Sequence, residues 1–198
     1  MQVRSEETRN HILEVSVQLF SKSGYDATGV AEICQAAGVS KGAFYHHFPS
    51  KQAVFLELLN SYLNGIDSGF NIMRQEIHNV PQTMLQMAEM VGSLFQTADI
   101  HLPIFLEFWT QANHDPHIWE TTVAPYRRYQ DYFAEMIQEG IREGSLEPMD
   151  PQLAARVLVA LAMGLLMQSL FDPQIADWQT EARQSVELLL NGMTRRTE

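Results

Sequence analysis

Apolar side chains recur along most of the chain at intervals of three or four residues, which is the period of an amphipathic helix, and strand-like alternation is absent. In the first quarter this pattern predicts three helices followed by a long fourth one. Gly24 ends the first, Thr28 caps the second, and Ser50 caps the fourth after a break at Pro49. The predicted ranges are 8–22, 29–37, 41–47 and from 51 to at least 63.

Helical patterns continue through the rest of the chain and predict an all-α fold of about nine helices. Pro81 and the pair Asp150-Pro151 mark helix starts, because proline is tolerated in the first turn, where its missing N–H is not needed. Asp172-Pro173 ends the helix that begins at Pro151. The predicted ranges are 81–96, 102–112, 118–144 with a bend allowed at Pro125, 151–171 and 176–192.

Charge divides the chain in two at Lys51. Residues 1–51 carry five basic and five acidic side chains, so the whole net charge of −11 comes from the residues after Lys51. Two domains with different electrostatic roles are the simplest explanation. We therefore expect a small domain over 1–51 and a larger, acidic domain over 52–198.

Composition indicates a globular protein of the cytoplasm. Apolar residues make up 45% of the chain, which is enough for a hydrophobic core. The first residues are polar and show no secretion signal, and the longest strongly apolar run, from Val157 to Met167, is shorter than the roughly 18 residues of a membrane span. Cys34 is the only cysteine, so no internal disulfide can form. We expect no membrane segment.

The segment from Thr28 to Lys51 has the pattern of a helix-turn-helix. Two short helices flank a tight turn at Gly38, where glycine tolerates a positive φ. Cys34 is small enough to let the two helices cross closely. Apolar residues spaced to fill the wedge between the helices are Ile33, Val39 and Phe44. In such a unit the second helix enters the major groove of DNA.

The outward side chains of that second helix are suited to DNA. Gly42 and Ala43 are small, so the backbone can approach the edges of the bases closely. Lys51 begins the next helix, where its charge and the helix N-terminus both favour a phosphate. Hydrogen-bond donors on the second helix are Ser40, Lys41, Tyr45, His46 and His47. Arg4 and Arg9 are candidates for a flexible arm in the minor groove, and for Arg4 a solvated N-terminus is the alternative.

This segment resembles the DNA-binding signature of the TetR repressors. The signature runs from a Gly-Tyr after the first helix, through a Thr, to Gly-Val-Ser-x-Gly-x-(Phe/Leu)-Tyr-x-His-Phe-x-x-Lys. The chain has Gly24-Tyr25, Thr28 and the residues from Gly38 to Lys51, and the match covers about a quarter of its length. It departs from the usual pattern at Gly29, where a hydroxyl residue is common, and at Cys34, where alanine is common.

The resemblance implies particular contacts with DNA. Phosphates would be bound by Tyr45, His47 and Lys51. Bases or phosphates would be contacted by Ser40, Lys41, Gly42, Ala43 and His46. Thr28 would lie at a helix start near the DNA backbone, and Gly29 would cost one phosphate contact.

The resemblance also implies a ligand-responsive homodimer that binds a palindromic operator as a repressor. A small molecule in the larger domain would move the fourth helix, with residues 54–63 as the lever, and so change the spacing of the two recognition helices. An activator role and a response to a protein partner stay open as alternatives, because the sequence does not separate them from ligand-induced repression.

A two-fold operator requires a two-fold protein, and the last two predicted helices are the candidates for its interface. Apolar residues repeat every four positions along 151–171, and small residues among them permit close helix approach. In the family this pair of helices forms a four-helix bundle across the dimer, although a stripe at this spacing also fits a core. The predicted interface residues are Leu153, Val157, Ala160, Leu161, Gly164, Leu165, Val186, Leu189, Leu190 and Met193.

The resemblance implies that the region between Met73 and Met167, where methionine and aromatic residues are concentrated, encloses a ligand pocket. Methionine side chains adapt to irregular apolar molecules, so we expect an apolar, bulky or elongated inducer, with an ordinary methionine-rich core as the alternative. Glu107 and Arg74 are either polar anchors or surface ion-pair partners. The predicted lining residues are Leu63, Met87, Phe105, Phe108, Trp109, Tyr126, Met163 and Met167.

The sequence contains no nucleophile with a neighbouring base, no phosphate-binding glycine loop and no HExxH motif, so we expect neither an enzyme nor a cofactor. His114-Asp115-Pro116-His117 is a metal candidate with His101 as a distant third ligand. A zinc site needs three or four converging ligands, and Pro116 favours a turn between helices. No metal site is therefore predicted.

Overall fold

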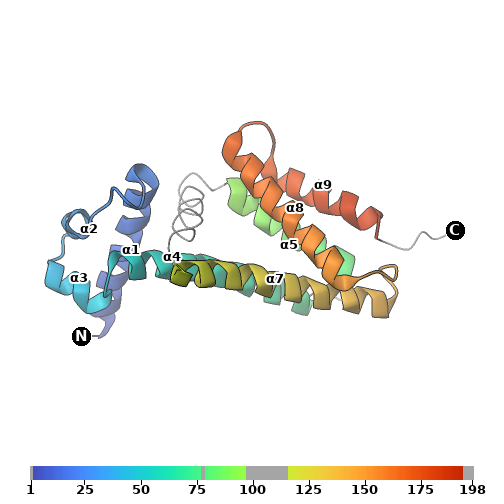
Figure 1. Cartoon of the computed structure of the whole chain (residues 1–198), viewed down its shortest axis with the longest axis horizontal. Coiled ribbons are helices and arrows are strands. Elements are labelled where there is room, and N and C mark those ends of the chain that lie inside the picture. The colour runs from blue at the N-terminus through green and yellow to red at the C-terminus, as the bar shows by residue number, and fades with distance from the viewer. Residues whose placement is uncertain (1, 77–78, 97–115, 194–198) are drawn as a thin grey trace. The chain divides into compact units, whose positions relative to one another are not determined.

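The computed structural model describes residues 2–76, 79–96 and 116–193, and its regular structure in these ranges is entirely α-helical (Figure 1). The all-α prediction is confirmed. The predicted helix over 102–112 lies outside the described residues. The described helices are α1 (Gln2–Ser23), α2 (Val30–Ala36), α3 (Lys41–His47), α4 (Lys51–Glu76), α5 (Val80–Gln96), α7 (Pro116–Glu143), α8 (Pro151–Phe171) and α9 (Trp178–Asn191).

The first helix begins earlier than predicted, at Gln2 rather than near residue 8. Arg9 therefore lies inside a helix, where its guanidinium is 2.8 Å from the Glu57 carboxylate of α4 and 5.2 Å from the centre of the Phe48 ring. The prediction that Arg9 belongs to a flexible arm is wrong, because these contacts and the helix fix it. Arg4 also lies in α1.

Capping side chains and glycines explain several of the helix ends. Asp150 and Asp177 cap α8 and α9, and their side chains accept hydrogen bonds from the Gln152 and Gln179 backbone N–H groups at 2.9 and 3.2 Å. Gly24 adopts a φ of +83° directly after α1, a backbone conformation that side chains with a Cβ rarely adopt. Capping aspartates and a glycine in the left-handed conformation therefore determine these helix boundaries.

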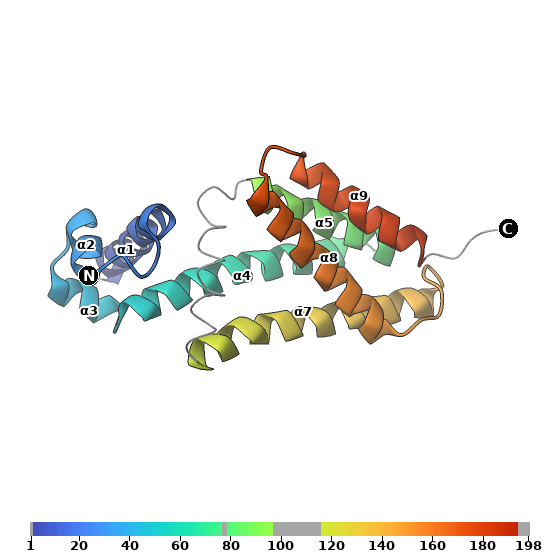
Figure 2. The same cartoon turned by 45° about the horizontal axis from the view of Figure 1, so that its top comes forward.

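The described residues form two compact units, one over 2–65 and the other over 66–96 and 116–193. α4 contributes residues to both (Figure 2). The first unit buries apolar side chains from all four of its helices, and three aromatic rings pack together in it, those of Phe20, Tyr25 and Phe55. Its buried residues include Ile12, Phe20, Ile33, Phe44, Phe48, Val54 and Phe55.

In the second unit α5 lies beside α9, and α7 packs against α8 (Figures 1 and 2). The approach of α5 to α9 depends on Gly92, because a Cβ at this position would lie 2.6 Å from the Trp178 carbonyl oxygen and 2.7 Å from the Gln179 Cα. Its core is rich in methionine, as the sequence allowed, and includes Phe70, Met84, Met87, Met136, Ile137, Ala155, Val186, Leu190 and Met193.

One described helix, α8, is long and apolar enough to cross a membrane by length and composition alone. The estimate from the sequence considered only the run from Val157 to Met167 and so missed this. Within the fold, α8 buries Ala155, Leu158 and Leu165 and packs against α7 and α9. It is thus a helix of the second unit with one face packed and another face apolar and exposed.

Replacing Gly92 with alanine should destabilise the protein. The new methyl group would meet backbone atoms of α9, which cannot rotate away, so the two helices must separate at a cost of about 1–3 kcal/mol. Urea unfolding at a fixed protein concentration measures this cost. The matched control is Gly65→Ala in α4, where a Cβ would meet nothing within 4 Å and should stabilise the helix by up to about 1 kcal/mol. Equal midpoints for the two variants would contradict the importance of the close approach.

Candidate nucleic-acid interface

The short helix α3 is fixed by a cap on one end and a buried ring at its centre. Ser40 precedes the helix, and its hydroxyl oxygen accepts a hydrogen bond from the Ala43 backbone N–H at 3.1 Å. The preceding turn contains Gly38 with a φ of +64°, which confirms the predicted need for glycine. Ile33 of α2 and Phe44 of α3 are fully buried. The two helices therefore form the predicted helix-turn-helix.

Burial of Phe44 leaves the opposite side of α3 in solvent. The Tyr45 side chain is 54% exposed, and its ring packs edge-on against the Phe44 ring with centroids 5.4 Å apart, which restrains its orientation. Ala43 and His47 are half-buried. The exposed residues on this side are Ser40, Lys41, Gly42, Tyr45 and His46. A face of this kind offers hydrogen-bond donors to the major groove of DNA. Its small side chains also let the helix backbone approach the bases closely.

Thr28 has a different role from the predicted one. Gly29, not Thr28, is the N-cap of α2, and no side chain caps that helix. The Thr28 side chain is fully buried, and its hydroxyl donates to the Gly24 carbonyl oxygen at 2.8 Å. The cap prediction is therefore wrong, because the hydroxyl points back to the end of α1. The Thr28 side chain is thus directed into the first unit, and its place near the DNA backbone stays a prediction.

Lys51 is likewise directed into the protein. Its ammonium donates to the carbonyl oxygens of Tyr25 and Thr28 at 2.6 and 2.9 Å, and it lies 4.0 Å from the centre of the Tyr25 ring. The helix start at Lys51 is as predicted. The side chain, however, connects α4 to the loop between α1 and α2.

Two histidines end the helix, and their rings are 5.1 Å apart. Desolvation lowers the pKa of His47 below its usual value, and the nearby His46 and Arg9 lower it further. His47 is thus neutral in the isolated protein over a wider pH range than a free histidine. A phosphate beside it would act in the opposite direction, because a negative charge favours the imidazolium form.

The predicted dimer interface divides into exposed and buried residues. Leu153 and Val157 are 54% and 43% exposed, Ala160 is exposed, and Leu161 and Gly164 are half-buried. Four other predicted residues lie in the interior of the chain itself: Leu165, Val186, Leu190 and Met193. Leu189 is half-buried and packs against the same core. These four side chains are already covered within one chain, so the exposed residues of α8 are the stronger part of the interface prediction.

Three exposed apolar residues of α8, α9 and the turn between them were missed by the sequence analysis. Phe171, Ile175 and Leu188 are 82%, 70% and 77% exposed. Phe171 continues the spacing of Leu153 and Val157 along α8, so the periodicity could have identified it. Leu188 lies between two core residues of α9, and only the packing distinguishes its side of the helix from theirs.

The predicted ligand residues are dispersed among the described helices. Met87 and Leu63 are buried, and Tyr126, Met163 and Met167 are half-buried. The others, Phe105, Phe108 and Trp109, lie outside the described residues. Glu107 also lies outside them. The structure therefore leaves the predicted apolar pocket untested.

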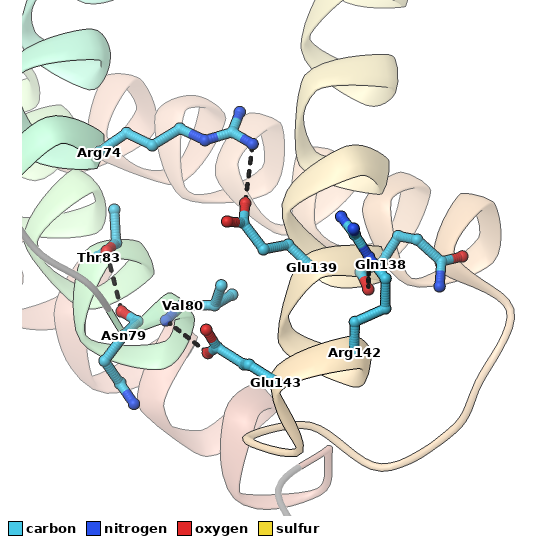
Figure 3. A network of polar contacts seen from close by, with 8 residues as sticks. All are labelled: Arg74, Asn79, Val80, Thr83, Gln138, Glu139, Arg142 and Glu143. Atoms are coloured by element: carbon cyan, nitrogen blue, oxygen red, sulfur yellow. Dashed lines mark hydrogen bonds and ion pairs between the residues drawn. The ribbon is translucent and has the colours of Figure 1, made fainter.

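A small cavity of about 120 Å³ lies where the ends of α4 and α7 meet the start of α5, and most of the residues that line it are polar or charged. Arg74 is paired with Glu139 at 2.9 Å, and the Val80 backbone N–H donates to the Glu143 carboxylate at 3.1 Å (Figure 3). Asn79 accepts a bond from the Gln82 backbone N–H at 3.0 Å. These contacts satisfy the N-terminus of α5 and join the three helix ends, so Arg74 is an ion-pair partner here.

The metal candidates His101, His114 and Asp115 lie outside the described residues, as does the side chain of His117. Within the described part of the chain, no group of three His, Cys, Asp or Glu residues is arranged to bind a metal ion. Cys34 is buried.

Comparison with known proteins identifies matches over both parts of the chain. Residues 12–58 match the family model described as bacterial regulatory proteins of the tetR family. Residues 82–193 match the model described as the C-terminal part of BetI-type transcriptional repressors. The HTH-type transcriptional regulator AcrR of Shigella flexneri is 28% identical over 203 residues, which cover 94% of this chain and 89% of that protein.

Two solved structures are similar over nearly the whole chain. A protein described as a transcriptional regulator from Saccharomonospora viridis, in complex with choline, has a TM-score of 0.81 at 23% identity and covers 96% of this chain and 100% of its own. The fatty acid degradation regulator FadR from Bacillus halodurans has a TM-score of 0.81 at 19% identity and covers 92% and 98%. At these identities the likeness concerns the fold.

Replacing His46 with glutamine should raise the pKa of His47 toward its ordinary value. The variant removes one of the positive charges that oppose protonation, while the desolvation and Arg9 contributions stay. An NMR titration of the His47 ring measures the shift directly. The pKa of His47 is lower in the folded state than in the unfolded state. The free energy of unfolding therefore decreases as the pH falls below the ordinary histidine pKa, and the variant should make this decrease smaller. An unchanged or lower pKa in the variant would exclude His46 as a cause.

Proposed function

The chain belongs to the TetR family of bacterial transcriptional regulators, and from this premise we propose that it is a repressor whose dimer binds a palindromic operator and releases it when a small molecule binds. Members of this family are regulators and not enzymes. The match of residues 82–193 to a repressor-type C-terminal model favours repression over activation. We infer a cytoplasmic location from the proposed binding to chromosomal DNA.

The observation that carries the DNA-binding proposal is the exposed side of α3. A buried Phe44 faces the core while Lys41, Tyr45 and His46 face solvent, so a seven-residue helix presents a donor-rich surface with a flat approach at Gly42. We assign base contacts to the first turn and phosphate contacts to Tyr45 and His47. The Thr28 side chain is directed into the first unit, and we assign no contact to it. The acidic residues after Lys51 would repel DNA elsewhere.

The proposed dimer uses the outer side of α8. Leu153, Val157 and Ala160 are exposed and lie on one side of the helix, and Phe171 extends the same stripe. Ala160 and Gly164 are small enough for two copies of α8 to approach closely. An exposed apolar stripe of this length is typical of a protein interface, and a second copy covering it also explains the apolar composition of α8 without a membrane.

The proposed inducer is an apolar molecule with a hydrogen-bonding group. The core of the second unit is rich in methionine and aromatic side chains, and the Tyr132 hydroxyl is buried among them beside Arg74. Burial raises the pKa of Tyr132, so this hydroxyl is a neutral donor. An acceptor on the ligand would receive a hydrogen bond from it. One similar structure contains choline and another is a fatty acid degradation regulator, so both kinds of molecule belong in a screen.

A DNA duplex carrying the region upstream of the protein's own gene should be retarded by the dimer in a gel-shift assay. Affinity should fall with salt, and Lys41→Met should weaken binding and reduce the slope of log K against log salt by about 0.9, the value for one phosphate contact. Lys22→Met is the matched control, since Lys22 is an exposed lysine in the last turn of α1. The absence of any shift at low salt would overturn the proposal. Molecules that abolish the shift identify the inducer.

Introducing a charge at Val157 should dissociate the dimer. A glutamate at this position would place a carboxylate within the apolar stripe of α8, where it cannot be solvated once two copies meet. Sedimentation velocity at several protein concentrations measures the change. Gln152→Glu introduces the same charge on an exposed residue of another side of α8 and should leave the dimer intact. If the Val157→Glu variant remains dimeric, the dimer interface does not lie on this side of α8.

A further inference from the structure

His47 ends the helix α3, and other groups that can carry positive charge lie close to it. Its side chain is half-buried, and its ring lies 5.1 Å from the ring of the neighbouring His46, with the two planes at 74°. The Arg9 guanidinium of α1 lies 5.2 Å from the centre of the ring of Phe48, the residue that follows His47. A proton on His47 would therefore add a positive charge where two others can already be present.

These surroundings oppose protonation of the ring. Desolvation lowers the pKa of His47, and the charges of His46 and Arg9 lower it further. The free protein therefore keeps a neutral His47 ring at a pH where an ordinary histidine is partly protonated.

Charged groups on the helices beside α3 do not cancel this effect in the described part of the chain. From α4, the Glu57 carboxylate is paired with Arg9 at 2.8 Å, and the Lys51 ammonium donates to carbonyl oxygens of the loop before α2. α2 has one charged residue, Glu32, which is exposed. Neither the two carboxylates nor the Lys51 ammonium is among the groups that shift the pKa of His47.

A DNA phosphate beside the ring would act in the opposite direction. Its negative charge favours the imidazolium form, and so do the carbonyl oxygens at the C-terminal end of α3, where His47 lies. A neutral imidazole offers one N–H group, whereas an imidazolium offers two and forms a stronger, charge-assisted hydrogen bond. The contact is therefore stronger when His47 binds a proton together with the phosphate.

We propose that operator binding takes up a proton at His47, so that the protein binds its operator more tightly as the pH falls. This inference rests on the proposed DNA-binding function and on the phosphate contact assigned to His47. As the pH falls, the affinity rises from the pKa of His47 in the complex down to its lower pKa in the free protein, and it rises no further below that value. Acidification should therefore oppose release of the operator.

The pH dependence of binding tests the inference. Fluorescence anisotropy measures the affinity of the full-length protein for the upstream duplex at a fixed KCl concentration, from about pH 5.5 to about pH 8.5. Between the two pKa values, the wild-type affinity should rise by up to about tenfold for each unit by which the pH falls, which is the limit for one proton. His47→Gln retains an N–H donor but cannot bind the proton, so its affinity should stay near the wild-type value at high pH. His11→Gln is the matched control, since His11 is an exposed histidine of α1 beside Glu14, and it should keep the wild-type pH dependence.

The salt dependence provides a second measurement, on the wild-type protein itself. A protonated His47 adds one cation to the phosphate contacts, so the slope of log K against log salt should be steeper at the low-pH end of the series than at the high-pH end by up to about 0.9. This measurement needs no substitution and so also covers the case in which His47→Gln does not fold. In a folded His47→Gln variant the slopes at the two ends should be equal.

Three results would overturn the inference while the DNA-binding function stands. They are a wild-type affinity that does not change with pH, a pH dependence of equal size in His47→Gln, and equal wild-type salt slopes at the two ends of the pH series. If the wild-type protein binds no duplex at any pH, even at low salt, the proposed function fails and the inference fails with it.

Discussion

Everything that α3 presents to solvent depends on the burial of one aromatic ring. A helix of seven residues is not stable by itself in water, because too few hydrogen bonds form to offset the entropy lost in nucleation. Phe44 is fully buried, and Phe48 follows one turn later with its ring 6.0 Å away, so the apolar side of α3 is held by the core of the first unit. The polar side is then defined by exclusion, since a helix that buries Phe44 must expose Lys41, Tyr45 and His46. Recognition chemistry is thus a consequence of packing on the opposite side.

The C-terminal helices α8 and α9 differ in how their apolar sides are buried. α9 buries its main apolar stripe within its own unit, through Val186 and Leu190, and approaches α5 closely enough that Gly92 has no room for a side chain. α8 has apolar residues on nearly all sides, so packing one side against α7 and α9 leaves Leu153 and Val157 in solvent. In the part of the chain that the structure describes, no element covers this outer side of α8. The apolar stripe of α9 is therefore buried within its own unit, whereas the outer apolar side of α8 is left exposed. The two helices differ in this way although their sequences carry similar apolar stripes.

The sequence predicted the parts of the fold that depend on local chemistry. Helix ends marked by Gly24, Asp150 and Asp172 follow from backbone conformation and capping, which act over a few residues. The recognition helix was predicted to the residue because a glycine turn and a proline flank it. What the sequence could not predict depends on contacts between distant segments. Lys51 meets the carbonyl oxygen of Tyr25, which is 26 positions away, and no periodicity reports a side chain bound to a distant main-chain oxygen. The same holds for the orientation of α9 about its axis, which only its neighbours decide.

The acceptors of Lys51 are main-chain oxygens, and this has a consequence for how the protein can change over generations. A carbonyl oxygen is present whatever side chain its residue carries, so the contact constrains the residue at position 51 far more than the residues whose oxygens it binds. Ala27, between the two acceptors, is exposed and can vary while the loop keeps its shape. Mutations there can therefore alter the surface next to the recognition helix at little cost in stability. Such a loop is a route by which descendants of one regulator can acquire different operators while keeping the same framework.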